Sequence, residues 1–261
     1  MSVPFEQRVM PAIYPTMGRK GALVIFCPSS NMTPALVERL VEETEAVIGE
    51  PVRHTVRKTF PQELTHNIAD EVTRAWKSPK QILTLCNKLS RPDHVTISAN
   101  RFPSFKGAAY PADYGVCSIE IGNTAPRALD LIAHLATFAA LSGAFMARAD
   151  SPLWRESMVA VAKERGISPD SLAAPFRFVS EQGWGISERF GWGTYLGPRC
   201  TREFGPLRAP ENIERLPDGG AIVWLTAAPF DFRDESHYSR YLELNRELAV
   251  HRHPGTQIGE F

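Results

Sequence analysis

The stretch that most constrains the fold runs from Ala128 to Ala147, ALDLIAHLATFAALSGAFMA. It is apolar on nearly every side, and a helix that is apolar all round is buried on most of its faces. We therefore predict a buried central helix with the other elements packed against it. The stretch is also about as long as a bilayer-spanning helix. However, Asp130 and His134 lie one turn apart within it, and ionisable groups are costly in hydrocarbon, so we do not expect a membrane protein.

Charge and composition narrow the classes of function. The chain has 261 residues with 29 basic and 29 acidic side chains, so its net charge is zero. A dedicated nucleic-acid binder normally carries a basic excess, and we therefore expect no nucleic-acid partner. The N-terminus lacks the long apolar run of a secretory signal. We expect a cytoplasmic protein.

The cysteines and histidines do not suggest a metal site. The four cysteines are far apart in sequence and form no CxxC pair: Cys27, Cys86, Cys117 and Cys200. Zinc sites and disulfide frameworks show closer spacing, so we expect buried, reduced thiols. His251 and His253 lie two residues apart near the C-terminus, but no carboxylate or cysteine follows at ligand spacing. We predict no metal and no cofactor.

Hydrophobic patterns along the chain predict one α+β domain over residues 1–261, with helices packed on a mostly antiparallel sheet around the central helix. Strands are expected at Ala22–Cys27, Pro51–Phe60, His94–Ala99, Tyr114–Ile121 and, as a hairpin about Pro217–Gly220, at Asn212–Leu216 and Ala221–Ala227. Helices are expected at 34–48, 61–76, 151–165, 198–204 and 234–250. The pattern over 77–93 is ambiguous, and a short helix over Gln81–Leu89 is one interpretation.

The sequence contains no clear motif of a hydrolase or a nucleotide-binding protein. The GxSxG pattern is absent, and Ser187 lies in GISER, which lacks the second glycine. Neither GxGxxG nor GK[ST] occurs among the glycines of residues 183–197. Asp130 and His134 lie on one helical face at i, i+4. In a buried helix we expect them to pair with each other or with a backbone group, and a catalytic dyad is the alternative. We assign no catalytic residue.

The stretch from Phe230 to Glu235 follows a predicted strand and precedes a predicted helix. Acidic groups at a helix N-terminus interact favourably with the helix dipole, which is the structural interpretation. The functional interpretation is an exposed acidic and aromatic patch that faces a basic partner, because aromatic side chains often anchor interfaces. The candidate partner-binding residues are Phe230, Asp231, Phe232, Asp234 and Glu235.

The C-terminal third carries a family pattern. An aromatic segment, WGTYLGP at 192–198, leads through Phe204-Gly205 to the glycine-bearing hairpin LPDGG at 216–220. An apolar strand and a closing helix with Tyr238 and Leu248 follow. This order resembles the immunity proteins of the type VI secretion system (T6SS), most clearly over about residues 190–250. The sequence departs from the family at 230–235, where we expected a glycine-aspartate turn.

The resemblance implies a binding protein without a reaction of its own. Such immunity proteins bind a cognate T6SS effector toxin, often nuclease-like, and block its active site or an assembly that it needs. Two alternatives stay open. One is an enzyme of unrecognised, hydrolase-like class that uses Asp130 and His134, or Ser187. The other is an adaptor or chaperone that delivers the effector and leaves it active. The sequence identifies neither the effector nor the oligomeric state.

Overall fold

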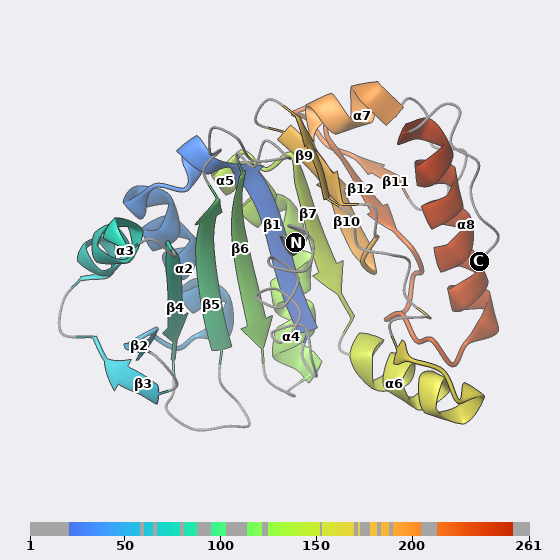
Figure 1. Cartoon of the computed structure of the whole chain (residues 1–261), viewed down its shortest axis with the longest axis horizontal. Coiled ribbons are helices and arrows are strands. Elements are labelled where there is room, and N and C mark those ends of the chain that lie inside the picture. The colour runs from blue at the N-terminus through green and yellow to red at the C-terminus, as the bar shows by residue number, and fades with distance from the viewer. Residues whose placement is uncertain are drawn as a thin grey trace, which may run out of the picture.

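The structure is a computed structural model of the chain. It describes residues 21–57, 60–64, 67–78, 81–87, 95–102, 114–121, 125–151, 153–169, 172, 178–181, 184–187, 190–204 and 213–252. The N-terminal segment discussed above and His253 lie outside these residues. The helices are η2 (Ser29–Asn31), α2 (Pro34–Ile48), α3 (Ile68–Lys77), α4 (Ala125–Ala133), α5 (Leu135–Ser142), α6 (Trp154–Arg165), α7 (Pro198–Phe204) and α8 (Glu235–Arg252) (Figure 1).

The strands form one large sheet and one small hairpin. They are β1 (Gly21–Pro28), β2 (His54–Arg57), β3 (Phe60–Glu63), β4 (Ile82–Cys86), β5 (Val95–Phe102), β6 (Tyr114–Ile121), β7 (Met146–Asp150), β8 (Phe178–Glu181), β9 (Trp184–Ser187), β10 (Gly193–Leu196), β11 (Ile213–Arg215) and β12 (Ala221–Trp224). Ten strands pair in the order β11-β12-β10-β7-β1-β6-β5-β4-β2-β3, and β8 pairs with β9. Every pairing is antiparallel, so the predicted α+β class with an antiparallel sheet is confirmed.

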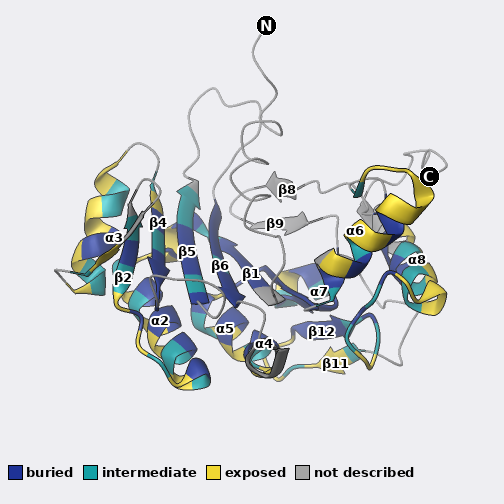
Figure 2. Ribbon diagram, turned by 90° about the horizontal axis from the view of Figure 1, so that it is seen from below, coloured by how far each residue is buried: buried dark blue, intermediate teal, exposed yellow. Residues whose placement is uncertain are grey.

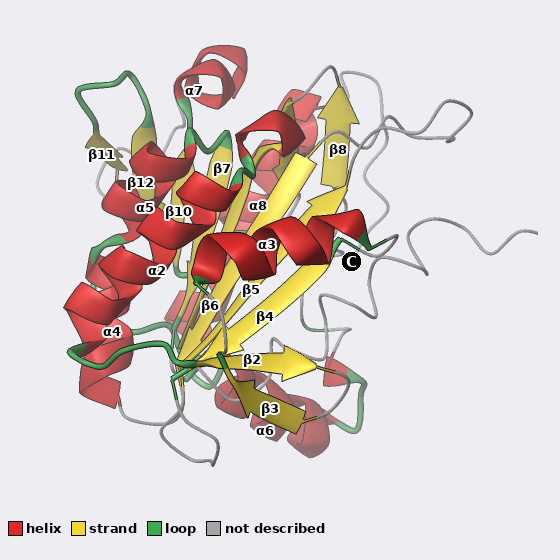
Figure 3. Cartoon of the chain, turned by 90° about the vertical axis from the view of Figure 1, so that its left-hand side faces the viewer, coloured by secondary structure: helices red, strands yellow, loops and turns green. Residues whose placement is uncertain are grey.

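Helices cover the sheet on both faces. On one face, α2, α4 and α5 lie together, and α4 and α5 contact the central strands (Figure 3). On the opposite side, α6 and α8 lie beside the C-terminal strands (Figure 2). The apolar residues of β1 are buried between the two layers, and Leu23 and Ile25 have no exposed surface. The core therefore runs along the sheet rather than around a helix.

The helix α2 forms where the sequence predicts it. The hydroxyl of Thr33 accepts a hydrogen bond from the Leu36 N–H at 3.2 Å, and Pro34 occupies the first helical position. Both features favour a helix start. Gly49 ends the helix with a φ of +69°, in the left-handed region that glycine enters without strain. The predicted bounds of this helix are confirmed.

The predicted central helix is wrong in two respects. The chain forms two short helices, α4 and α5, that meet at His134, and the segment after Gly143 forms the strand β7. The helices also expose an outer face, so they are not buried all round. Periodicity does not distinguish a fully buried strand from a buried helix, and all five residues of β7 are buried. Gly143, with a φ of +57°, ends α5.

Two further helix predictions fail between residues 60 and 90. Residues Phe60–Glu63 form β3 instead of starting a helix, and α3 begins only after Asn67, whose side chain accepts a hydrogen bond from the Asp70 N–H at 2.8 Å. The segment Ile82–Cys86 is the strand β4, not a short helix. It pairs with β2 and β5, and three of its five residues are buried. This apolar run is too short for its periodicity to separate helix from strand.

The C-terminal hairpin and closing helix agree with the sequence. β11 and β12 pair across the turn at residues 217–220, and Gly219 has a φ of +86°. Asp218 fixes the turn, because its carboxylate accepts bonds from the Tyr195 hydroxyl at 3.0 Å and from the Gly220 N–H at 2.8 Å. The hairpin is thereby attached to β10, and it forms one wall of the site described next.

Candidate functional site

The two phenylalanines predicted to anchor a partner are buried. Phe230 and Phe232 expose 0% and 2% of their surface. The ring of Phe230 lies 4.7 Å from that of Trp154 and 5.9 Å from that of Tyr241, measured between centroids. The prediction that they form an exposed patch is therefore wrong. The chain turns at this point so that α8 packs back towards α6, and these rings fill the space between the two helices.

The acidic residues of the same stretch stay accessible but make local bonds. Asp231 accepts hydrogen bonds from Arg233 at 2.7–3.0 Å, and these bonds hold the pKa of its carboxyl below its usual range. Asp234 accepts bonds from the N–H and hydroxyl of Ser236 at 2.9 and 2.6 Å, so it caps α8, and these bonds lower its pKa. Glu235 is exposed in the first turn. Their contact with a partner stays a prediction.

The other sequence candidates do not converge into a catalytic arrangement within the described residues. The Nδ1 of His134 donates to the backbone carbonyl of Asp130 at 2.8 Å, and the side chain of Asp130 is exposed. The pairing is therefore with a backbone group at the end of α4, and it is not a buried dyad. The side chain of Ser187 lies outside the described part of the chain.

The four cysteines are buried and none of them forms a disulfide, as predicted. Burial raises the pKa of the Cys27 and Cys117 thiols to about 12, so neither ionises near neutral pH, and only the thiolate is a strong nucleophile. Among the residues that the structure describes, no cluster of three or more histidine, cysteine, aspartate or glutamate side chains forms a metal site. None of the described helices has the length and apolar character needed to cross a membrane.

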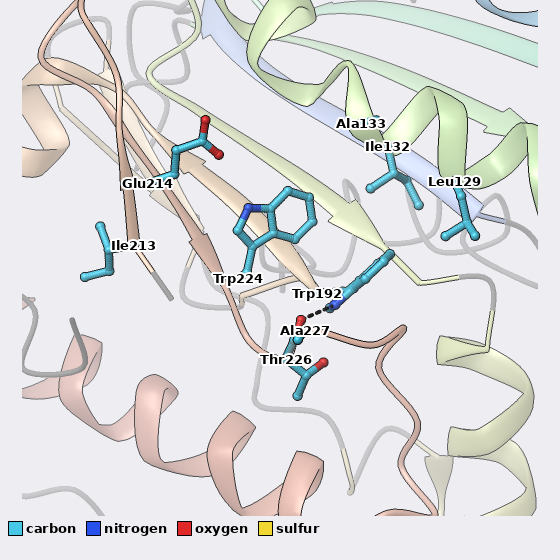
Figure 4. A pocket seen from close by; sticks show the side chains of 9 residues that line it. All are labelled: Leu129, Ile132, Ala133, Trp192, Ile213, Glu214, Trp224, Thr226 and Ala227. Atoms are coloured by element: carbon cyan, nitrogen blue, oxygen red, sulfur yellow. Dashed lines mark hydrogen bonds between the residues drawn. The ribbon is translucent and has the colours of Figure 1, made fainter. Parts of the chain in front are cut away.

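A cavity of about 530 Å³ opens between α4 and the C-terminal end of the sheet (Figure 4). Three residues of α4 form one wall: Leu129, Ile132 and Ala133. Leu129 keeps 38% of its surface exposed, so this wall of the cavity is open to solvent. Thr226 and Ala227, just after β12, close the opposite end.

Two indoles form the floor of this cavity. The rings of Trp192 and Trp224 meet edge to face, with centroids 5.5 Å apart at 66°, an arrangement that aromatic pairs favour. The Nε1–H of Trp192 donates to the Thr226 carbonyl at 2.9 Å, which fixes the orientation of that ring. Trp224 lies opposite Gly193 on β10. A Cβ at position 193 would come within 2.5 Å of this indole, so the ring occupies space that only glycine leaves free.

The edge strand β11 supplies the remaining wall, with Ile213 and Glu214. Glu214 pairs with Ile222 in the sheet register, so its side chain lies on the same face as Trp224. Glu214 is exposed and is the one charged side chain among the described residues that line the cavity. The cavity therefore combines apolar walls, two aromatic rings and one carboxylate.

The apolar character continues onto the outer face of α4 and α5. Among the residues of α4 and α5 whose side chains the structure describes, the exposed ones are Leu129, Asp130, Ala133, Thr137 and Ala140. A solvent-facing helix surface is usually rich in charged residues, whereas Asp130 is the single charge among these five. Exposed apolar surface beside a cavity is typical of interaction sites.

Sequence reasoning missed this site. The glycines of residues 183–197 carry no nucleotide-binding motif, and Trp224 lies in the predicted strand Ala221–Ala227, so neither segment predicts a cavity. The cavity depends on the register between β10 and β12, which places Trp224 over Gly193. The GWG motif at 191–193 is a local sequence signal for close packing of a ring against the backbone, but it does not specify how β10 and β12 align.

Comparisons with known proteins show a similarity at the level of the fold. No family model matches the chain, and no curated protein matches it. Among solved structures, the fold is similar to that of the Pseudomonas aeruginosa T6SS protein PA0821. The TM-score is 0.52 at 16% sequence identity, and the match covers 95% of this chain and 84% of that chain. At this identity the likeness concerns the fold, which the two proteins share over nearly the whole of this chain.

Proposed function

We propose that this chain is a T6SS immunity protein that binds a cognate effector toxin in the cytoplasm of the producing bacterium and neutralises it. The observation that carries the proposal is the fold shared with a T6SS protein over 95% of the chain. The resemblance of residues 190–250 to immunity proteins supports the same association. Inhibition would act by covering the active site of the toxin or by blocking an assembly that it requires.

The surface of the protein is compatible with binding. A stable complex buries about 1,600 Å² in total, and its affinity is concentrated in a few aromatic and charged anchors. The Trp192–Trp224 cavity and the neighbouring outer face of α4 and α5 supply an apolar area with aromatic groups. The acidic residues Asp231, Asp234 and Glu235 at the start of α8 form a second, more polar candidate surface.

The direct test is to isolate the partner. The tagged protein is purified from its own bacterium while the effector is expressed, and the retained proteins are identified by mass spectrometry. We expect one stoichiometric partner with a toxin domain, whose activity in a purified assay falls as the protein is added. A partner that stays fully active in the complex would indicate the adaptor role instead. Failure to retain any partner under these conditions would contradict the proposal and favour the enzyme alternative.

A further inference from the structure

The cavity between α4 and β12 has the composition of a site for a cationic side chain. Two indoles form its floor, and the carboxylate of Glu214 lies on the same sheet face as Trp224. Cations are attracted to the face of an indole and to a carboxylate. No cation is among the described lining residues that would neutralise Glu214, and within the described part of the chain Glu214 makes no ion pair. The charge of this site is therefore complementary to a positive group from outside.

Among cationic side chains, the geometry favours arginine. A guanidinium is planar, stacks on an aromatic ring and donates several hydrogen bonds at once, whereas an ammonium is a compact and strongly hydrated charge. The rings of Trp192 and Trp224 are inclined at 66°, so a planar group that lies on one ring presents its edge towards the other. The cavity of about 530 Å³ is larger than one arginine side chain. Apolar neighbours of the arginine would contact Leu129 and Ile213 on the two walls.

We propose that this cavity is the anchor site for an arginine of a partner protein, flanked by apolar residues, that stacks on the indoles and pairs with Glu214. The inference rests on the proposed function in one respect, because it takes the effector as the protein that supplies the arginine. The chemistry of the site itself is independent of the partner's identity. Trp192 and Trp224 act as the stacking platform, and Glu214 selects the positive charge.

The first experiment uses a probe and needs no effector. Acetyl-Leu-Arg-Leu-amide is titrated into the full-length protein, and the indole N–H signals of Trp192 and Trp224 are followed by NMR. The matched probe replaces arginine with citrulline, which has the same shape without the charge. We expect the arginine peptide to shift both signals and to bind at least about tenfold more tightly than the citrulline peptide. Equal binding of the two peptides, or no shift of these signals at millimolar peptide, would overturn the proposal.

Variants localise the effect. Glu214→Gln should remove the preference for arginine over citrulline, because it deletes the charge and keeps the shape of the side chain. Glu42→Gln, at an exposed position of α2, is the matched control and should leave the preference intact. Both positions are exposed, so the thermal unfolding midpoints of the variants should equal that of the wild-type protein. An arginine preference that survives Glu214→Gln would place the cation elsewhere.

The second experiment uses the purified effector. Glu214→Arg introduces a like charge into the site, and we expect it to weaken effector binding by at least about a hundredfold. If the wild-type protein neutralises the effector and Glu214→Arg does so equally well, the arginine site is wrong and the immunity function stands. If the wild-type protein binds no effector, the immunity function is wrong, and the peptide titration still decides the site. A wild-type dimer in light scattering that Glu214→Arg dissociates would show that a second copy occupies the cavity.

Discussion

At the scale of single residues, the absence of a side chain at Gly193 shapes the candidate site as much as the tryptophans do. The Trp224 indole occupies the space where a Cβ at position 193 would lie, 2.5 Å from the ring. The ring is therefore held flat across β10, facing Trp192. Close packing against Gly193 thus holds the Trp224 ring in the floor of the cavity, and a hydrogen bond from this ring is not needed.

Gly193→Ala is expected to displace this indole. The new methyl group forces the Trp224 ring away from β10, which opens the contact with Trp192 and changes the near-ultraviolet circular dichroism of the aromatic side chains. Affinity for the arginine peptide should fall in parallel. The control is Gly166→Ala, where φ is +65° and no atom lies within 4 Å of the added Cβ. That variant strains the backbone but should leave the aromatic signal unchanged. An unaltered signal in Gly193→Ala would mean that the ring is not held as described.

The Asp231–Arg233 pair predicts a specific pH dependence. Bonds from Arg233 hold the pKa of Asp231 below its ordinary value of 3.8. A carboxyl whose pKa is lowered by folding stabilises the folded state above its unfolded pKa, and this contribution disappears as the pH falls through its folded pKa. Arg233→Ala should therefore lower the urea midpoint at pH 7, and the difference from wild type should shrink steadily below pH 3.8. Because Arg233 exposes about half of its side chain and Asp231 about a fifth, solvent screens the pair and the effect should be small. A difference that is constant from pH 7 to acid would contradict this account.

At the scale of elements, the sequence predicts best where local signals define both ends. The helix α2 has an N-cap, an N-terminal proline and a terminal glycine, and its bounds are correct. The hairpin about 217–220 is correct for the same reason, since its turn residues are specific. The segment Ala128–Ala147 fails because its apolar residues fit a helix and a buried strand equally well. Gly143 is the residue within this segment that favours the end of a helix, and α5 ends there.

The packing of α8 on α6 gives the main prediction at this scale. Phe230 is fully buried against Trp154 and Tyr241. Phe230→Ala removes a large buried ring and leaves a cavity, so we expect the free energy of unfolding to fall by about 3–5 kcal/mol. Urea denaturation measures this change. Val159→Ala, at an exposed position of α6, is the control and should change stability by less than about 0.5 kcal/mol. A loss for Phe230→Ala as small as the control would mean that the ring is exposed after all.

At the scale of the whole molecule, the class of the fold was predictable and its functional surface was not. Charge balance, composition and alternating strands indicate an α+β protein with an antiparallel sheet. The candidate cavity, in contrast, brings together α4, β10, β11 and β12, which are separated by up to about 100 positions of sequence. No local pattern specifies such a meeting. The stretch 230–235 was mispredicted in the opposite direction. Its position between a strand and a helix suggests an exposed loop, but Phe230 and Phe232 are part of the core.

The described part of the surface is compatible with the binding function proposed above. Among the described residues, its accessible features include an apolar helix face, an aromatic cavity with one carboxylate and a polar helix start. The titratable groups that the structure describes at the sequence candidates do not meet in one cleft. An interface protein needs this kind of surface.

A competition assay between bacterial strains tests the proposed immunity function in the cell. The test strain carries deletions of both the gene for this protein and the gene for its matching effector. It is grown in contact either with its wild-type parent or with a parent whose T6SS is inactive. We predict that the strain is killed by the wild-type parent, survives beside the inactive one and is fully protected when the gene is restored. Equal survival beside both parents would contradict the claim that the protein neutralises a T6SS effector.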